Sequence, residues 1–362
     1  AMTPTEIQQA IKSGNIIHAV APEQRNFAGM DLSGGSFIAV DLMGADFRGC
    51  NLHETQFSEC TLSGAQFDDA QLRGTLFSQC RMVATQFSGC TLTDCLFNQC
   101  QLMESDFSES IHINSQFNKG DLSDSCFLLA SLYQSGFIEL PVHQWLLRHA
   151  RLEQCTLMSR DLRRSDLNSA GFALCTFYQC DLRGGDYRQQ RFARSQVTAS
   201  KLEEASFFGA ELTQCNFSQV SLRAADLRQI QASQALFTGS DLREARCSEA
   251  NFNQAILMQT QLDEADFSHS QLSRAVLQQA HAPRANFQHS QLQYADLSYA
   301  TLDHADFRDA HFTHTRLHRA SQQQSDFSSR DGIIEQDEAL YAAENWRPHT
   351  RLAPHEDHQE SR

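Results

Sequence analysis

The 362-residue sequence lacks the features that mark several common classes of protein. It has no apolar run of 18 residues, so no transmembrane helix is expected, and it shows no secretory signal. It contains no phosphate-binding loop, no G-x-S-x-G and no H-E-x-x-H, and it has no C-x-x-C among its 12 cysteines. These absences predict a cytoplasmic protein that is not an enzyme and holds no cofactor. Ala1 before Met2 is typical of a cloning remnant.

A five-residue period runs without a break from Phe27 to Phe327. Every residue in this span whose number ends in 2 or 7 is the centre of one repeat, which gives 61 centres. Of the 25 phenylalanines, 24 stand at centres, and Phe208 is the exception. The residue two before each centre is small, and the other three positions are mostly polar or glycine. A period of five fits neither a helix nor a simple strand, so it predicts a repeat architecture.

The period has a simple physical explanation. One large and one small apolar residue in every five must face a shared interior, which a chain achieves by turning a corner every five residues. Four such sides close one turn of 20 residues, and turns stack at roughly 4.8 Å. The 61 centres then give about 15 turns and a rod of roughly 70 Å. Residues 20 apart should form columns, such as the phenylalanines from Phe27 to Phe127 and those from Phe37 to Phe137.

The pattern A(D/N)LXX, often with phenylalanine at the centre, resembles the pentapeptide-repeat family. Residues 161–170 and 295–305 match it closely, and the resemblance covers about five-sixths of the chain. It implies an all-β solenoid, a right-handed quadrilateral β-helix. With short helices expected at both ends, the predicted organisation is an N-terminal capping helix and lead-in (1–24), a first repeat block (25–137), a non-repeat excursion (138–150), a second repeat block (151–330), a C-terminal capping helix (331–346) and a disordered tail (347–362).

The excursion at residues 138–150 is predicted because the small-residue rule fails there. Leu140 and Trp145 occupy positions where alanine or serine is expected. Pro141 can start a helix, and the following apolar residues have helical spacing. We therefore predict a short helix packed outside the rod. It serves either as a structural patch or hinge, or as a binding site for a partner, with Trp145 and Leu146 as exposed anchors.

Charge is unevenly distributed along the chain, whose net charge is −15. Residues 1–137 have a net charge of −9, whereas residues 151–202 have a net charge of +4. We call the second segment the basic belt. It is either a solvated surface of mixed charge or a docking site for an acidic partner, and the arginines proposed for such contacts are Arg160, Arg163, Arg164 and Arg183.

Cysteine and histidine offer two further possibilities. Ten cysteines stand at the small position, where they can replace alanine as small apolar residues, and reduced thiols are expected. His269, His289 and Asp309 are 20 apart and should form an exposed column. A His/His/Asp set can bind a divalent metal. A fortuitous column is the simpler interpretation, and no metal site is predicted.

Two functions are compatible with this sequence. The first is a non-catalytic scaffold or adaptor that docks protein partners. A likeness to pentapeptide tails of type VI secretion accessory proteins makes a secretion role an expectation. The alternative is a DNA mimic, since the family includes gyrase-protecting proteins that resemble a B-form duplex and dimerise through the C-terminal end. The acidic first half fits this alternative, and a homodimer through the C-terminal helix is one expectation. The basic belt does not fit it, and the overall charge disfavours direct DNA binding.

Overall fold

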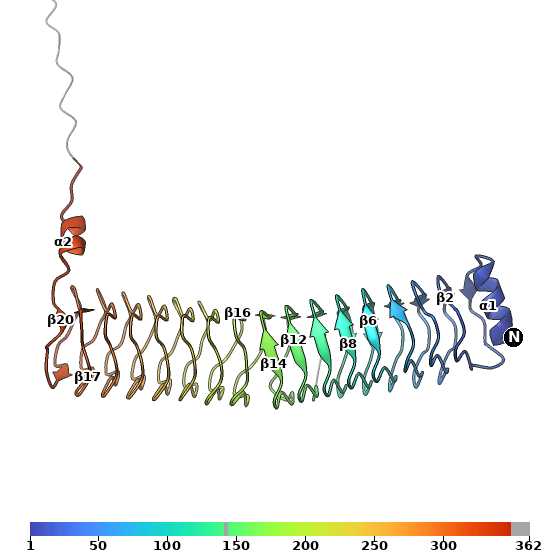
Figure 1. Ribbon diagram of the computed structural model, residues 1–362, viewed down its shortest axis with the longest axis horizontal. Helices are drawn as coiled ribbons and strands as arrows, with labels where there is room; N and C mark the ends of the chain where they lie inside the picture. The colour runs from blue at the N-terminus through green and yellow to red at the C-terminus, as the bar shows by residue number, and fades with distance from the viewer. Residues whose placement is uncertain (141–143, 349–362) are drawn as a thin grey trace, which may run out of the picture.

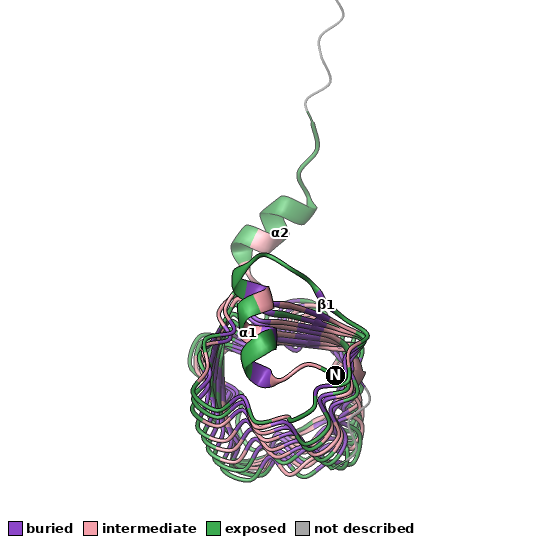
Figure 2. Ribbon diagram, turned by 90° about the vertical axis from the view of Figure 1, so that its right-hand side faces the viewer, coloured by how far each residue is buried: buried purple, intermediate pink, exposed green. Residues whose placement is uncertain are grey.

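The computed structural model describes residues 1–140 and 144–348. The chain forms a long coil of parallel turns with one short helix at each end (Figure 1). The coil has about 16 turns once the lead-in is included. Seen along its axis, each turn is roughly four-sided, and the turns superimpose (Figure 2). The predicted right-handed quadrilateral β-helix is confirmed.

The corners of the coil are made by the backbone at positions whose numbers end in 4 or 9. Most of these residues have φ in the left-handed region, for example 58° at Glu109 and 60° at Gln254. This conformation disfavours side chains other than glycine. It persists here because each turn is held by backbone hydrogen bonds to the next, as from Phe87 N to Asp106 O at 2.7 Å. The repeating strain is therefore offset by a repeating hydrogen-bond network.

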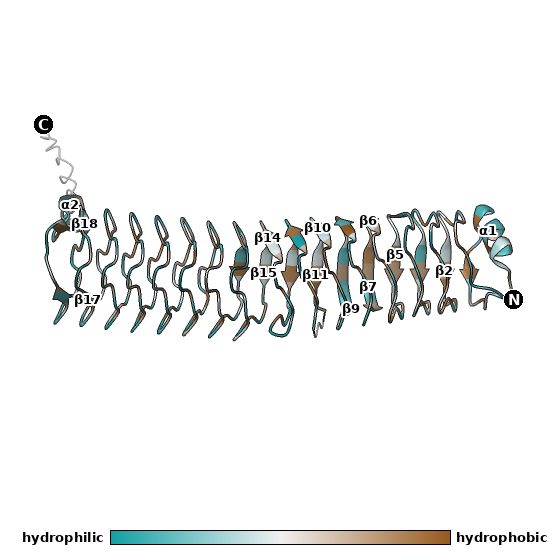
Figure 3. Cartoon of the chain, turned by 60° about the horizontal axis from the view of Figure 1, so that its bottom comes forward, coloured by the Kyte–Doolittle hydropathy of each residue, from teal (hydrophilic) through white to brown (hydrophobic). Residues whose placement is uncertain are grey.

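Two parallel sheets cover two sides of the rod within residues 17–198, and residues 20 apart pair in register in both (Figure 3). The ten-stranded sheet contains β1 (Ile17–His18), β2 (Ser36–Ile38), β3 (Gln56–Ser58), β5 (Leu76–Ser78), β7 (Leu96–Gln101), β9 (Gln116–Asp121), β11 (Gly136–Ile138), β13 (Thr156–Met158), β15 (Thr176–Tyr178) and β16 (Gln196–Thr198). The six-stranded sheet contains β4 (Leu72–Arg73), β6 (Thr91–Thr93), β8 (Ile111–Ile113), β10 (Ser131–Tyr133), β12 (Arg151–Glu153) and β14 (Gly171–Ala173). Two short pairs follow near the C-terminus: β17 (Asp306–Phe307) with β19 (Asp326–Phe327), and β18 (Thr315–Arg316) with β20 (Ile333–Ile334).

The core is the column structure that the period predicts. Successive phenylalanine rings of one column stack almost parallel, as for Phe67 and Phe87, whose centroids are 4.6 Å apart. Rings of the two facing columns meet edge to face, as for Phe77 and Phe87 at 6.1 Å. Aromatic pairs favour both arrangements beyond the area that they bury. The first block is therefore filled by two interlocked aromatic columns.

The predicted excursion at 138–150 is wrong in the residues described there, which contain no helix. Leu146 forms parallel bridges with Cys126 in the turn before it and with Asp166 in the turn after it, so the coil continues. The indole of Trp145 fits inside because the described centres between Phe137 and Phe172 are smaller than phenylalanine: Leu147, Leu152, Leu157, Leu162 and Leu167. Residues 141–143, which include Pro141, lie outside the described residues.

The N-terminal helix α1 (Pro4–Lys12) covers the first turn of the coil (Figure 2). Its start follows the expected capping pattern, with the side chain of Thr3 accepting a hydrogen bond from the backbone N–H of Glu6 at 3.2 Å. Ile7 and Ile11 are buried against the coil. The helix thus shields apolar side chains that an open coil end would expose.

The C-terminal helix α2 (Glu338–Glu344) does not cap the coil, contrary to the prediction for residues 331–346. It is shorter than expected because Ile333 and Ile334 form β20 and continue the coil by pairing with β18. The helix projects to the side of the last turns, and none of its residues is buried (Figure 1). Most of the predicted disordered tail, residues 349–362, lies outside the described residues.

Candidate interaction surfaces

Three arginines of the basic belt, Arg163, Arg183 and Arg188, each form an ion pair with the aspartate two residues earlier. Arg163 pairs with Asp161 at 2.7 Å and Arg183 with Asp181 at 2.8 Å. Each aspartate also accepts the backbone N–H of its arginine, so the pair forms a closed local unit. The hydrogen bond from Arg183 lowers the pKa of Asp181 below its ordinary value. The guanidinium groups of these three pairs therefore offer hydrogen-bond donors more than free charge.

Trp145 is not an exposed anchor, and this prediction is wrong. Its side chain is fully buried, with its ring centroid 5.6 Å from that of Phe127 and 4.8 Å from that of Phe137. Its position number ends in 5, which is the inward small position of the repeat. The indole Nε1 has no hydrogen-bond partner.

Arg160 is also buried, and it does not belong to the surface of the belt. Its guanidinium carbon lies 4.9 Å from the centroid of the Trp145 ring and 5.6 Å from that of Phe137. None of its three side-chain nitrogens has a hydrogen-bond partner. Burial lowers the pKa of Arg160 to about 9. The number 160 marks an inward small position, so the repeat rule itself indicated an interior side chain.

The other predicted contact residues are accessible. Leu146 is 39% exposed, and Arg163, Arg164 and Arg183 are exposed. They do not form one cluster, because Leu146 lies on the side that contains the centres Phe127 and Leu147. The three arginines lie on the preceding side of the square, around the centres Leu162 and Leu182.

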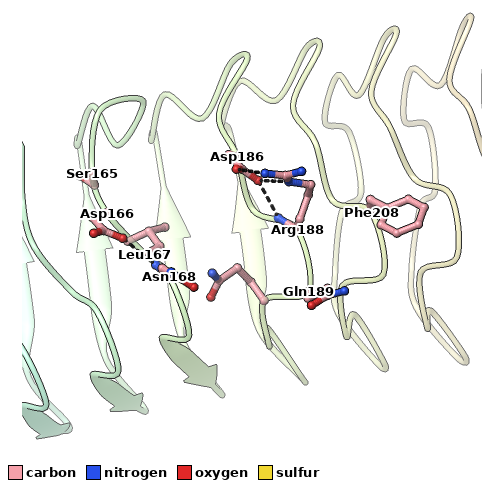
Figure 4. A pocket seen from close by; sticks show the side chains of 9 residues that line it. Ser165, Asp166, Leu167, Asn168, Asp186, Arg188, Gln189 and Phe208 are labelled. Carbon is pink, nitrogen blue, oxygen red and sulfur yellow. Dashed lines mark hydrogen bonds and ion pairs between the residues drawn. The ribbon is translucent and has the colours of Figure 1, made fainter.

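An open hollow of about 560 Å³ lies beyond Leu146 on the same side of the rod. Asp166 and Asn168 border one end, and Arg188 and Phe208 border the other (Figure 4). Arg188 is held by Asp186 at 2.8 Å, and the guanidinium carbon of Arg228 lies 5.2 Å from the centroid of the Phe208 ring. The hollow therefore combines an aromatic wall with hydrogen-bond donors and acceptors.

The predicted column of His269, His289 and Asp309 forms. The two imidazole rings stack with centroids 4.6 Å apart, and His289 Nε2 lies 3.6 Å from the carboxylate of Asp309. Stacked rings extend in parallel and do not converge on one point, as metal ligands must. Among the described residues, no group of three histidine, cysteine or acidic side chains is arranged to hold a metal ion.

A polar cluster attaches α2 to the side of the coil. Glu344 contacts His318 Nε2 at 2.5 Å, Arg319 Nε at 2.6 Å and the Tyr299 hydroxyl. The other ring nitrogen of His318, Nδ1, accepts the backbone N–H of Asp337 at 2.9 Å. Nε2 of the neutral ring therefore carries the hydrogen and donates a hydrogen bond to Glu344. The hydrogen bond from Tyr299, followed by that from His318, lowers the pKa of Glu344.

Sequence reasoning missed Phe208 and the hollow beside it. The signal was present, because Phe208 is the one phenylalanine outside the repeat centres. The hollow itself has no sequence signal, since it depends on side chains from turns 20 and 40 residues apart.

No helix among the described residues is long and apolar enough to cross a membrane.

Two family models match the chain. One, described as a pentapeptide repeat region, matches residues 30–107 and 170–247. The other, described as pentapeptide repeats (8 copies), matches residues 240–279, 270–309 and 290–328. Together they span most of the coil on both sides of the segment around Trp145. No curated protein matches.

Several solved structures are similar to this chain. HetL, a pentapeptide repeat protein involved in heterocyst differentiation regulation in the cyanobacterium Nostoc, is 23% identical, with 88% of this chain and 98% of HetL covered and a TM-score of 0.24. A pentapeptide repeat protein from the Arabidopsis thaliana thylakoid lumen is 21% identical over 38% of this chain and 76% of its own, with a TM-score of 0.22. QnrB1, a plasmid-mediated fluoroquinolone resistance protein, is 13% identical over 80% and 96%, with a TM-score of 0.19. TM-scores this low say nothing about what this chain binds.

Proposed function

The chain belongs to the pentapeptide-repeat family, and from this premise we propose that it is a non-catalytic scaffold that holds a protein partner on the outside of a rigid rod. The proposal rests on Phe208. It is the one phenylalanine of 25 outside the repeat centres, and it borders the open hollow described above. Partly buried aromatic residues beside arginines are typical anchors of protein interfaces.

The composition of this surface indicates the chemistry of the partner. Arg188 and Arg228 flank Phe208, and Leu146 adds an apolar side chain on the same side. On the neighbouring side, Arg163, Arg164 and Arg183 contribute donors that suit carboxylates. The partner in this proposal is a protein segment that has an apolar or aromatic residue next to acidic ones.

We place this scaffold in the bacterial cytoplasm as part of the same proposal. All twelve cysteines are free thiols, and the ten at the small position donate to or pack against backbone of the preceding turn, as Cys90 does to Phe67 O at 3.0 Å. Reduced thiols suit a reducing compartment. A component of a secretion system is one candidate partner.

A pull-down from a lysate of the native host tests the proposal. We expect Phe208→Ala to lose the partner that the wild type retains. Tyr294→Ala is the matched control, because Tyr294 is an exposed aromatic residue on another side of the rod. Like Phe208, it lies beneath an arginine, with the guanidinium carbon of Arg274 at 4.6 Å from its ring centroid. Equal recovery with wild type and Phe208→Ala, confirmed with purified components, would refute docking at the hollow.

DNA mimicry is the second candidate, and the acidic segment 1–137, with a net charge of −9, favours it. Residues 151–202, with a net charge of +4, interrupt the negative charge along the rod. In the same pull-down, DNA gyrase or topoisomerase recovered at low salt and lost at high salt would favour the mimic, since a duplex-like surface binds through screened charge.

We also propose α2 as a contact between two copies. The helix buries no residue, while Tyr341 is 45% and Trp346 is 70% exposed. Sedimentation of the full chain with Trp346→Ala tests this contact. An unchanged mass distribution at all concentrations would refute it.

A further inference from the structure

The side of the coil that contains Leu147 is interrupted at one place. On this side the residue before each centre forms a parallel bridge with its equivalent in the next turn. Among the described residues, such bridges link every turn within residues 26–166 and every turn within residues 186–326, but none links Asp166 to Asp186. The hollow of about 560 Å³ lies between these two turns (Figure 4). We call this interruption the open seam.

Four backbone groups at the open seam have no hydrogen-bond partner within the described part of the chain. They are the C=O of Ser165 and the N–H of Leu167 on the first turn, and the N–H and C=O of Asp186 on the next. One turn earlier the equivalent bond is present, from Leu147 N to Asp166 O at 2.8 Å. The two turns therefore face each other with unpaired strand edges.

Two side-chain oxygens at the open seam also lack a partner among the described residues. The side chain of Gln190 is only 5% exposed, and its Oε1 accepts no hydrogen bond. The Oγ of Ser165 is buried and unpaired in the same way. Both residues border the hollow. Because buried polar groups are normally hydrogen-bonded, the seam is a place where a ligand can supply bonds that the coil does not.

We propose that the open seam receives an extended segment of the partner protein as an inserted parallel strand. Both edges carry N–H and C=O groups, and an extended main chain pairs with two such edges at once. This inference rests on the proposed function, because it specifies how the partner segment beside Phe208 is held. Insertion requires two strand spacings, roughly 9.6 Å, between the two turns on this side. The turns must therefore spread apart here while the other three sides stay paired.

The coil itself shows which bonds such a strand makes. Residues 65–67 lie between two turns on the same side of the rod. Gln66 N–H donates to Ala45 O at 2.9 Å, and Phe67 N–H donates to Gln86 O at 2.7 Å. The C=O groups of the same segment accept two N–H groups in return. A short segment can thus satisfy both neighbouring turns with four hydrogen bonds.

A copy of this segment matches the open seam in hydrogen bonding and in charge. It would donate to the C=O groups of Ser165 and Asp186, and it would accept from the N–H groups of Leu167 and Asp186. Its phenylalanine would point into the coil. The next residue, copied from Asp68, would point outward beside Arg188, because these positions belong to one column. An aromatic residue followed by an acidic one is the chemistry proposed for the partner.

Amide hydrogen exchange of the free full chain tests whether the seam is open. We expect the N–H groups of Leu167 and Asp186 to exchange at least about 100-fold faster than those of Leu147 and Tyr187, which are hydrogen-bonded in the adjacent turns. Equal protection of all four amides would show that the seam is closed and would overturn the proposal.

A fluorescent peptide that copies residues 64–70, capped at both ends, tests insertion by anisotropy with the full chain. We expect saturable binding in the micromolar range. N-methylation of the two amides copied from Gln66 and Phe67 removes both donors and leaves the side chains unchanged, so it should weaken binding at least about tenfold. Equal affinity for the two peptides, or no binding of the unmodified one, would overturn the proposal.

A reversible disulfide across the seam separates this inference from the proposed function. Ser169→Cys/Gln189→Cys places one thiol on each turn, and the disulfide holds their Cα atoms within about 7 Å, too close for a strand to enter. We expect the reduced form to bind the peptide at least about tenfold more tightly than the oxidised form. Equal binding by both forms, abolished by Phe208→Ala, would overturn insertion and leave docking beside Phe208 standing. Binding that is lost on oxidation and kept in Phe208→Ala would support insertion and refute Phe208 as the anchor.

Discussion

Arg160 provides the sharpest test of the packing described above. Its guanidinium is buried in the interior of the coil, between aromatic rings, without a hydrogen-bond partner. We predict that Arg160→Met stabilises the protein. Methionine is unbranched and of similar length, so it fills the same space without a charge.

The magnitude follows from two opposing contributions. A buried polar group without a partner costs about 1–3 kcal/mol, and a charged group costs more. A desolvated cation–π contact, here with Trp145 and Phe137, returns about 2 kcal/mol. Replacing a poorly compensated buried charge with an apolar residue gains about 1–4 kcal/mol in proteins. We therefore expect a gain of about 1–3 kcal/mol at pH 7.

The sign of the pH dependence is also determined. Burial lowers the pKa of Arg160 from 12.5 to about 9 in the folded protein, so the folded state disfavours the charged form. The penalty is complete below pH 9 and falls as the pH rises from 9 towards 12.5. Arg160→Met should accordingly gain the same stability at pH 6 and pH 8, and its advantage should shrink at higher pH.

Denaturant unfolding followed by the fluorescence of Trp145 measures the effect. The assay uses a Trp346→Phe background, because Trp346 is exposed and would add a signal unrelated to the core. Arg160→Lys is the matched control: it keeps the charge, loses the planar stacking and should not stabilise. Destabilisation by Arg160→Met of more than about 1 kcal/mol would refute the reasoning, since it would mean that the guanidinium is well satisfied.

Three further predictions follow from other parts of the coil. Thiol titration of the native protein should give one fast cysteine, Cys126, because the other eleven cysteines are buried. Burial raises the pKa of Cys50 to about 11 and that of Cys215 to about 12. Any fast thiol in Cys126→Ser would contradict this prediction. Phe207→Ala should lower the free energy of unfolding by about 3–5 kcal/mol, and Phe208→Ala by less than about 1 kcal/mol, because only Phe207 is fully buried. Equal losses in the two variants would show that Phe208 is a structural residue. The helix α2 should detach from the coil in acid, because the contacts of Glu344 lower the pKa of its carboxyl group. The stability that these contacts contribute is present above the unfolded pKa of about 4.5 and is lost as the pH falls through the lower folded pKa. Equal hydrogen-exchange protection of α2 at pH 7 and pH 3 would rule this out.

The segment around Trp145 shows where sequence reasoning fails. The rule that the position two residues before each centre is small was treated as a limit on size, so Trp145 was predicted to lie outside. The interior accepts it because the neighbouring centres Leu147, Leu157 and Leu167 are smaller than phenylalanine, and because Ser125 and Ser165 lie above and below it. Such volume compensation involves residues 20 apart, and a rule applied one repeat at a time does not include it.

The C-terminal segment failed for a related reason. Its apolar spacing indicated one helix, but part of it continues the coil because β18 offers an open edge for β20. The rest is placed by Glu344 and His318, which are 26 residues apart. The helix propensity of the local sequence predicts neither of these contacts.

The sequence alone determined the architecture, because a five-residue period with one large and one small apolar residue can bury its apolar surface only as a four-sided coil. It also determined the columns, since parallel stacking places every residue above the one 20 positions earlier. Only the tertiary structure decided which side chains and hollows the outer surface presents. The accessibility of Leu146 and the hollow beside Phe208 arise from side chains of successive turns. Their neighbours are set by stacking, and nothing in one repeat specifies them.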